Sequence, residues 1–82
     1  TATVLRGGQA HTVSPEDVAL GEVIMVKPGQ RIPLDGLILR GESNLDNSAL
    51  TGESEPVFAE AGMRVLSGGV NQTGVLYIMV ER

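Results

Sequence analysis

Carboxylate side chains are the groups in this sequence best suited to acid–base chemistry, and several of them gather in the middle of the chain. Glu53 and Glu55 lie in a run with almost no apolar residues, at positions 51–56, and Asp46 lies shortly before it. Two carboxylates can serve as general acid and general base, so a free-standing hydrolase that uses Glu53 and Asp46 is one hypothesis. A solvated surface loop is the alternative, because acidic residues in loops usually face water. Composition alone does not separate the two.

Other catalytic and binding motifs are missing from the sequence. The Gly-Glu-Ser runs at 41–43 and 52–54 both lack the second glycine of a hydrolase nucleophile elbow. There is no cysteine, which excludes a thiolate nucleophile, a disulfide and a Cys-based zinc site. His11 is the only histidine, and without visible partners we assign it no role. The Gly-rich phosphate-binding motifs are absent as well, so we expect this chain to bind no nucleotide and no metal itself.

Length and charge narrow the possible functions further. The chain has 82 residues, which is enough for one small domain and too few for two catalytic lobes. Its net charge of −4 would repel nucleic acid and anionic lipid headgroups, which makes both poor partners. Hydrophobic residues make up 41% of the chain and aromatic residues 2%, so the core must be aliphatic. The chain begins at Thr1 without an initiator Met or an apolar leader, and we expect it to be a piece of a longer protein.

We expect short strands joined by turns, because the 11 Gly and 4 Pro residues favour turns and interrupt longer elements. Strands at 1–6 and 9–13 should form a hairpin through a Gly-Gly turn, and a short helical turn should follow from Ser14. Further strands are expected at 22–26, 37–39, 57–58, 64–66 and 75–80, with an edge strand beginning at Ile32.

Turns are expected to separate these strands. A type II turn should occupy residues 27–30, and the segments 41–47 and 71–74 are interpreted as polar connections. Asp46, Asn47 and Ser48 could cap a single helical turn. The segments 23–26, 37–39 and 75–80 should form most of the core.

The predicted fold is therefore all-β. It is a small distorted antiparallel β-barrel or jelly-roll-like sandwich with one or two short helical turns, in a single domain over residues 1–82.

Two longer blocks of sequence carry a family resemblance. The first is PGQRIPLDG at residues 28–36, and the second is DNSALTGESEPV at residues 46–57. Together they resemble the actuator domain of P-type ATPases, and the similarity covers most of the chain from about Val18 onward. The chain is most similar to the heavy-metal-transporting branch. Ser54 stands where copper transporters often carry proline, which favours zinc, cadmium, lead or cobalt. Asn47 and Gln30 replace acidic residues that are more usual in the family.

The resemblance implies a function and a site. P-type ATPases form a covalent aspartyl-phosphate on a separate domain, and the Thr-Gly-Glu loop of the actuator later covers that phosphate. By residue match, Glu53 would orient and deprotonate the attacking water. Gly52 would allow close backbone approach, and Thr51 and Ser54 would fix the loop. The match implies the same β fold.

The resemblance also implies where the rest of the machinery lies. ATP and Mg²⁺ would be handled by other domains, and no cofactor or metal would be bound by this segment. Its partners would be the phosphorylation domain, the nucleotide-binding domain and the transmembrane helices of the same parent chain. It would be a cytoplasmic, monomeric part of an integral membrane protein, inactive in isolation. The alternative is a non-catalytic β-barrel protein-interaction module that uses the Pro28-Gly29 turn, for which the block at 51–56 would be a coincidence.

Overall fold

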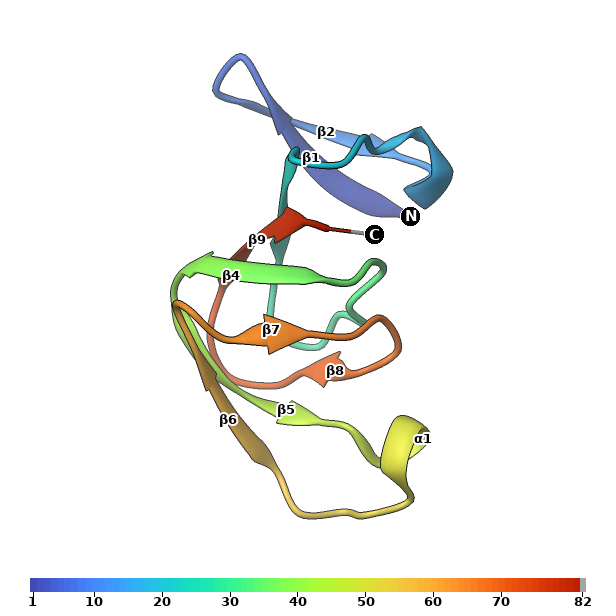
Figure 1. The fold of residues 1–82 in the computed structure, drawn as a ribbon, viewed down its shortest axis with the longest axis vertical. Helices are drawn as coiled ribbons and strands as arrows, with labels where there is room; N and C mark the ends of the chain where they lie inside the picture. The colour runs from blue at the N-terminus through green and yellow to red at the C-terminus, as the bar shows by residue number, and fades with distance from the viewer. Residues whose placement is uncertain (82) are drawn as a thin grey trace.

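The computed structural model describes residues 1–81, and its strands form two antiparallel sheets (Figure 1). The larger sheet has the order β2-β1-β3-β9-β4-β7, and the smaller has the order β6-β5-β8. The strands are β1 (Ala2–Arg6), β2 (Gln9–Val13), β3 (Val23–Val26), β4 (Gly36–Arg40), β5 (Glu42–Asp46), β6 (Val57–Glu60), β7 (Arg64–Val65), β8 (Val70–Asn71) and β9 (Leu76–Val80). Two short helical elements complete the fold, the 3-10 turn η1 (Pro15–Asp17) and the helix α1 (Ser48–Thr51).

The predicted hairpin at the start of the chain is confirmed. Strands β1 and β2 pair antiparallel with Arg6 opposite Gln9, so the turn between them contains only Gly7 and Gly8. Both glycines have positive φ, at 59° and 77°, as a tight two-residue hairpin turn requires. The helical turn expected after Ser14 is η1, which begins at Pro15.

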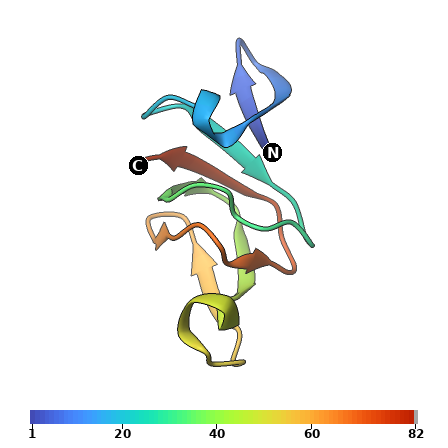
Figure 2. The same cartoon turned by 90° about the vertical axis from the view of Figure 1, so that its right-hand side faces the viewer.

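Four connections carry the chain from one sheet to the other (Figure 2). These connections are β4 to β5 through Gly41, β6 to β7 through Gly62, β7 to β8 through Gly68 and Gly69, and β8 to β9 through Gly74. A side chain at Gly41 would collide with the carbonyl oxygen of Val75, and one at Gly74 would collide with that of Glu42. Glycine is therefore required at these two bends because backbones pass too closely for a Cβ atom.

An aliphatic core fills the space between the strands. The segments predicted to form most of it supply half of the twelve buried apolar side chains: Ile24, Val26, Ile38, Leu76, Ile78 and Val80. The other six are Ala2, Val4, Ile32, Leu45, Ala59 and Val65. The remaining half comes from the hairpin, from the smaller sheet, from the segment before β4 and from β7.

The smaller sheet corrects the sequence prediction in two places. Residues 41–47 were interpreted as a polar, turn-rich connection, but Glu42–Asp46 forms β5. Its polar Ser43 is 3% exposed and its Leu45 is also buried, so the strand does have an inward face. The connection predicted at 71–74 likewise contains part of β8, which is only two residues long.

Two further expectations need correction. Ile32 was predicted to begin an edge strand, but it lies outside the strands, and only its neighbour Arg31 forms a single bridge, with Val70. The antiparallel all-β organisation with short helical turns is confirmed, although the two sheets remain open layers and do not close into a barrel.

The molecule is elongated, with extents of 36, 21 and 20 Å. The β1–β2 hairpin lies at one end of the long axis, and α1 with the loop that follows it lies at the other (Figure 1). Within residues 1–81, helices are all too short to cross a membrane.

Candidate functional site

The candidate site begins with the short helix α1, which leads into the predicted Thr-Gly-Glu-Ser loop. The backbone N–H of Ser48 donates to Asp46 Oδ1 at 2.9 Å, so Asp46 holds the first residue of the helix. Hydrogen bonds from the hydroxyl and the backbone N–H of Ser48 lower the pKa of the Asp46 carboxyl group. The carbonyl oxygen of Asn47 accepts from the N–H groups of Leu50 and Thr51, at 2.9 and 3.0 Å. The predicted capping at residues 46–48 is thus made by the Asp46 side chain and the Asn47 backbone.

Gly52 ends the helix in a left-handed conformation. Its φ is 78°, and its N–H donates to the carbonyl oxygen of Ser48 at 2.8 Å. Because a left-handed C-terminal residue is strained for any side chain with a Cβ, glycine is the favoured residue here. A Cβ at Gly52 would meet nothing within 4 Å of this domain, so its surface is open for another molecule to approach.

Thr51 fixes the direction in which the chain leaves the helix. Its hydroxyl donates to the carbonyl oxygen of Asn47 at 3.2 Å and accepts from the backbone N–H of Glu53, also at 3.2 Å. These two bonds tie the backbone of Glu53 to the helix. The structure therefore brings together Thr51, Gly52 and Glu53 as one rigid turn.

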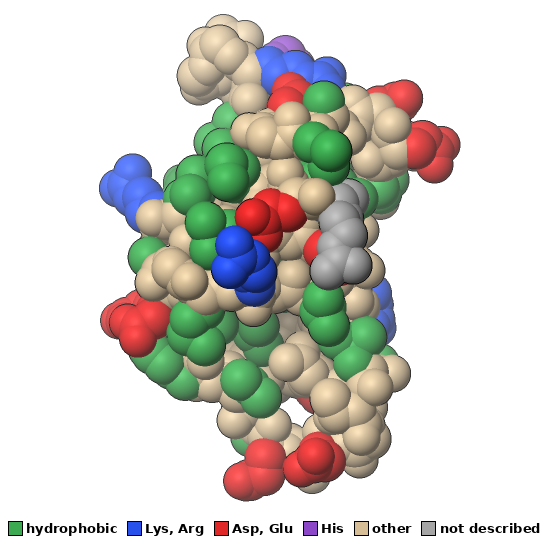
Figure 3. All heavy atoms as spheres, viewed as in Figure 1, with side chains coloured by type: hydrophobic (Ala, Val, Ile, Leu, Met, Phe, Trp, Pro, Cys, Tyr) green, Lys and Arg blue, Asp and Glu red, His purple; other side chains and the backbone are tan. Residues whose placement is uncertain are grey.

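The side chains that follow point into solvent. Glu53, Ser54 and Glu55 are all exposed, as predicted for this loop. Acidic side chains project at the end of the molecule that carries α1 (Figure 3). The Asp46 carboxylate is held by Ser48, whereas Glu53 is exposed beyond the helix end.

Other candidate positions lie elsewhere in the fold. His11 is exposed on β2, opposite Val4 of β1, in the hairpin at the far end of the molecule. Residues 1–81 contain no group of three or more His, Asp or Glu side chains that could hold a metal ion.

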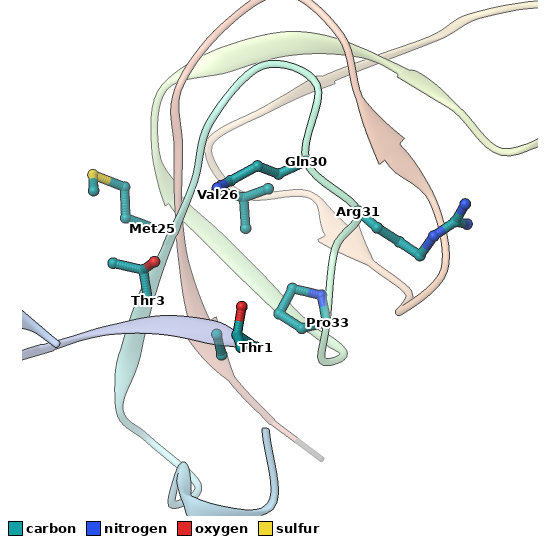
Figure 4. Close-up of a pocket in the computed structure, with 8 residues that line it drawn as sticks. Thr1, Thr3, Met25, Val26, Gln30, Arg31 and Pro33 are labelled. Carbon is teal, nitrogen blue, oxygen red and sulfur yellow. The ribbon is translucent and has the colours of Figure 1, made fainter. Parts of the chain in front are cut away.

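A cavity of about 230 Å³ opens near the N-terminus, and the Thr51–Ser54 loop does not contribute to it (Figure 4). Its lining residues are Thr1, Ala2, Thr3, Met25, Val26, Gln30, Arg31 and Pro33. The Arg31 side chain extends away from the others and donates to the carbonyl oxygen of Gly68 at 2.6 Å. The side-chain oxygen of Gln30 accepts from the N–H of Lys27 at 2.8 Å. These two polar side chains are therefore engaged in contacts within the domain.

Sequence reasoning missed the residues against which α1 packs. Gly68 and Gly69 were given no role from the sequence, yet side chains at these positions would meet Leu50 and Asn47. The paired glycines are the one sequence signal of this close approach, because glycine is required where two segments pass closely.

Comparison with known proteins assigns this geometry to a family. A family model described as the P-type ATPase actuator domain matches residues 1–82. A zinc-transporting ATPase of Synechocystis sp. is 50% identical over 82 residues, covering 100% of this chain and 11% of that protein. A cadmium, zinc and cobalt-transporting ATPase of Bacillus subtilis is 53% identical over 70 residues, covering 85% of this chain and 10% of that protein.

A copper transporter and a solved structure are also similar. A probable copper-exporting P-type ATPase of Archaeoglobus fulgidus is 43% identical over 82 residues, covering 100% of this chain and 10% of that protein. The crystal structure of a zinc-transporting PIB-type ATPase in the E2.Pi state superimposes with a TM-score of 0.92 at 37% identity. That match covers 99% of this chain and 13% of the solved one. The chain thus spans about a tenth of the length of these relatives.

Proposed function

The chain belongs to the family of P-type ATPase actuator domains, and we propose that it is the actuator of an ATP-driven pump for heavy-metal cations. In this proposal the loop Thr51-Gly52-Glu53-Ser54 promotes hydrolysis of an aspartyl-phosphate formed on another domain of the pump. The observation that carries the proposal is the exposed Glu53, fixed by its backbone to Thr51 just beyond the left-handed Gly52 at one end of the molecule.

Glu53 has the chemistry that the reaction requires. A carboxylate accepts a hydrogen bond from water and takes up its proton as the water attacks phosphorus, which is general base catalysis. Its exposure suits this role, because the phosphate belongs to a different domain and the two must meet at a surface. Gly52 supports close approach, since no side chain stands between its backbone and the partner domain.

The negative charge of the loop must be offset at that meeting. Glu53 and Glu55 would repel a phosphorylated aspartate unless cations lie between them. We propose that Mg²⁺ and a basic side chain of the phosphorylation domain supply this positive charge. ATP and Mg²⁺ would thus be bound by other parts of the pump and not by this domain.

The strand scaffold suits a second role in coupling. A domain that turns hydrolysis into movement of transmembrane helices must transmit force without deforming. The two sheets are joined by four strand connections, with glycine at the closest approaches, which supports such rigidity. The domain would lie on the cytoplasmic side of the membrane, next to the helices it moves.

The transported substrate is proposed to be a divalent metal such as zinc or cadmium. Relatives named for zinc transport, or for cadmium, zinc and cobalt transport, are 41–53% identical to this chain, and relatives named for copper transport are 39–43% identical. Ser54, in place of the proline common in copper transporters, points in the same direction. The ions themselves would be bound outside this domain.

Steady-state measurements on the full-length pump test this proposal. With Glu53→Gln, zinc-stimulated ATP hydrolysis should be lost while phosphoenzyme accumulates, because the intermediate still forms but is not hydrolysed. Cadmium and copper salts, used in place of zinc, test the metal preference. Normal turnover of the variant would remove Glu53 from the mechanism.

A further inference from the structure

A short segment that follows both family-like sequence blocks in the chain lies between them in space. It consists of Ser67, Gly68 and Gly69, in the connection from β7 to β8, and we call it the support segment. On one side it contacts the block at 28–36, and on the other it contacts α1, which carries the Thr-Gly-Glu-Ser loop. The first block has no part in the chemistry proposed above, so its contacts with this segment call for a physical reason.

Four hydrogen bonds anchor the support segment to the first block. The guanidinium of Arg31 donates to the carbonyl oxygen of Gly68 at 2.6 Å. The backbone of Ile32 exchanges two bonds with the segment, since its N–H donates to Gly69 at 2.7 Å and its carbonyl accepts from Gly68 at 2.9 Å. The N–H of Ser67 donates to Asp35 Oδ1 at 2.7 Å. Ile32 is 1% exposed, so this anchor is set in the core.

On its other side the support segment lies directly against α1. A Cβ at Gly68 would come within 3.0 Å of Leu50 Cδ2, and a Cβ at Gly69 would collide with Asn47 Oδ1. Val70, the next residue, pairs with Asp46, which holds the first residue of the helix. The side chains of Asn47, which precedes α1, and of Leu50 within it therefore pack over backbone that carries no side chain at the points of contact.

We propose that Gly68 and Gly69 are positioning residues for hydrolysis of the aspartyl-phosphate. The support segment transmits the fixed position of Arg31 and Ile32 to α1, and thereby sets where Glu53 meets the phosphate. Glycine leaves room for the side chains of Leu50 and Asn47 against the segment, so a methyl group there pushes on these side chains and, through them, shifts the helix and the loop. This inference rests on the function proposed for Glu53. It assigns to the first block the task of holding that residue in place.

The matched pair Gly68→Ala and Gly62→Ala in the full-length pump tests the proposal. Both glycines have left-handed φ, at 102° and 92°, so alanine is strained at both. Only at Gly68 would the added methyl meet α1, because a Cβ at Gly62 has nothing within 4 Å. Phosphoenzyme decay should be about threefold to tenfold slower with Gly68→Ala than with Gly62→Ala, since small misplacements of a catalytic group reduce rate steeply. The amount of phosphoenzyme formed should be equal in the two.

A second-site change separates positioning from general destabilisation. Leu50→Ala removes the side chain that the new methyl would meet, so in that background Gly68→Ala and Gly62→Ala should decay at the same rate. Slowing that persists without the Leu50 side chain would overturn the proposal, and so would equal decay of the two single variants. If Gly68→Ala yields no folded pump, Gly69→Ala decides, because Gly69 is free of left-handed strain. Its slowing should be reversed by Asn47→Ala, and absence of slowing or of reversal would refute the role.

Glu53→Gln, measured in parallel, keeps this inference separate from the proposed function. Slow decay with Glu53→Gln and wild-type decay with both glycine variants would sink the positioning role alone. Unchanged decay with Glu53→Gln would sink the proposed function, and the positioning role with it.

Discussion

Gly52 is the residue at which the helix α1 ends and the loop that carries Glu53 begins. Its φ of 78° lies in the region that glycine alone adopts without strain. The N–H of Gly52 bonds back to Ser48, and the next residue, Glu53, is tied to Thr51. Individual residues of the loop therefore have separable roles, with Gly52 and Thr51 shaping the turn and Glu53 left free for chemistry.

Replacement of Gly52 should cost stability through the backbone alone. Gly52→Ala is expected to lower the free energy of unfolding by about 1 kcal/mol, because alanine in the left-handed region is strained while nothing nearby is struck. Gly52→Asn should cost less, since asparagine tolerates this conformation. Chemical denaturation of the three proteins measures the difference. Wild-type stability of Gly52→Ala would argue against the left-handed cap.

At the level of elements, a buried polar network joins β5 to the bend between β8 and β9. The Ser43 hydroxyl donates to the side-chain oxygen of Asn71 at 2.5 Å and accepts from the N–H groups of Thr73 and Gly74, at 3.1 and 2.9 Å. The Asn71 amide donates to the carbonyl oxygen of Val26 in β3 at 3.0 Å. Since Asn71 is 0% exposed, its bonds are shielded from water.

Loss of Asn71 should therefore be severe. Asn71→Ala leaves the Ser43 hydroxyl and the Val26 carbonyl without this partner in the interior, which should cost roughly 2–4 kcal/mol of unfolding free energy. Gln72→Ala is the matched control, because Gln72 is exposed and its backbone bond to Asn44 is retained. Thermal and urea unfolding of both variants provide the measurement. Equal stability of the two would show that the network contributes little.

The β1–β2 hairpin is attached to the rest of the larger sheet by an ion pair that should respond to pH. Arg6 contacts Glu22 at 2.9 Å, and this hydrogen bond, together with one from the N–H of Ala19, lowers the pKa of Glu22 from 4.5 to about 2. Because the folded state favours the carboxylate, its contribution to stability is present above the ordinary pKa and is lost as the pH falls through the folded one.

Glu22→Gln removes this contribution. The stability difference between wild type and Glu22→Gln should be constant above pH 4.5 and should shrink as the pH falls toward about 2. Its size at neutral pH should be small, because the pair is exposed to solvent. Unfolding measured over this range checks the slope, with Glu55→Gln as an exposed control. A difference independent of pH would contradict the ion pair.

Local signals in the sequence predicted several elements, and long-range contacts explain those that it did not. The Gly7-Gly8 turn identified the first hairpin because turn chemistry is local. Strand β5 was missed because Ser43 looks like a solvent-facing residue until Asn71 and Gly74 are known to satisfy it. The exposed loop was predicted from residues 51–56, and the family resemblance from the two blocks at 28–36 and 46–57.

The contact between the support segment and α1 could not be predicted from the sequence. Gly68 lies far along the chain from Leu50, and the paired glycines indicate a close approach without showing that Leu50 is the residue approached. The sequence also could not show whether the strands close into a barrel. Whether strands form a barrel or two open layers depends on where glycine bends carry them between sheets, and those bends at Gly41 and Gly74 are set by contacts with distant backbone.

At the scale of the whole molecule, the strands form a scaffold, and the loop proposed to act on the phosphate lies at one end of it. The domain is 36 Å long, with the hairpin at one end and α1 with its acidic loop at the other. A net charge of −4 suits docking to a cation-bearing partner surface rather than to nucleic acid. The arrangement fits a rigid body that presents Glu53 to a second domain, in keeping with the family to which the chain belongs.

The central claim is that Glu53 acts on a phosphoenzyme, and its decay rate tests this most directly. The full-length pump would be labelled with radioactive ATP and chased with unlabelled nucleotide, comparing wild type with Glu53→Gln and Glu55→Gln. Glu55 is also an exposed acid two positions along, so its variant controls for loss of charge. We predict decay slowed by about 10²–10⁴-fold in Glu53→Gln alone. Decay as fast in Glu53→Gln as in wild type would contradict the account.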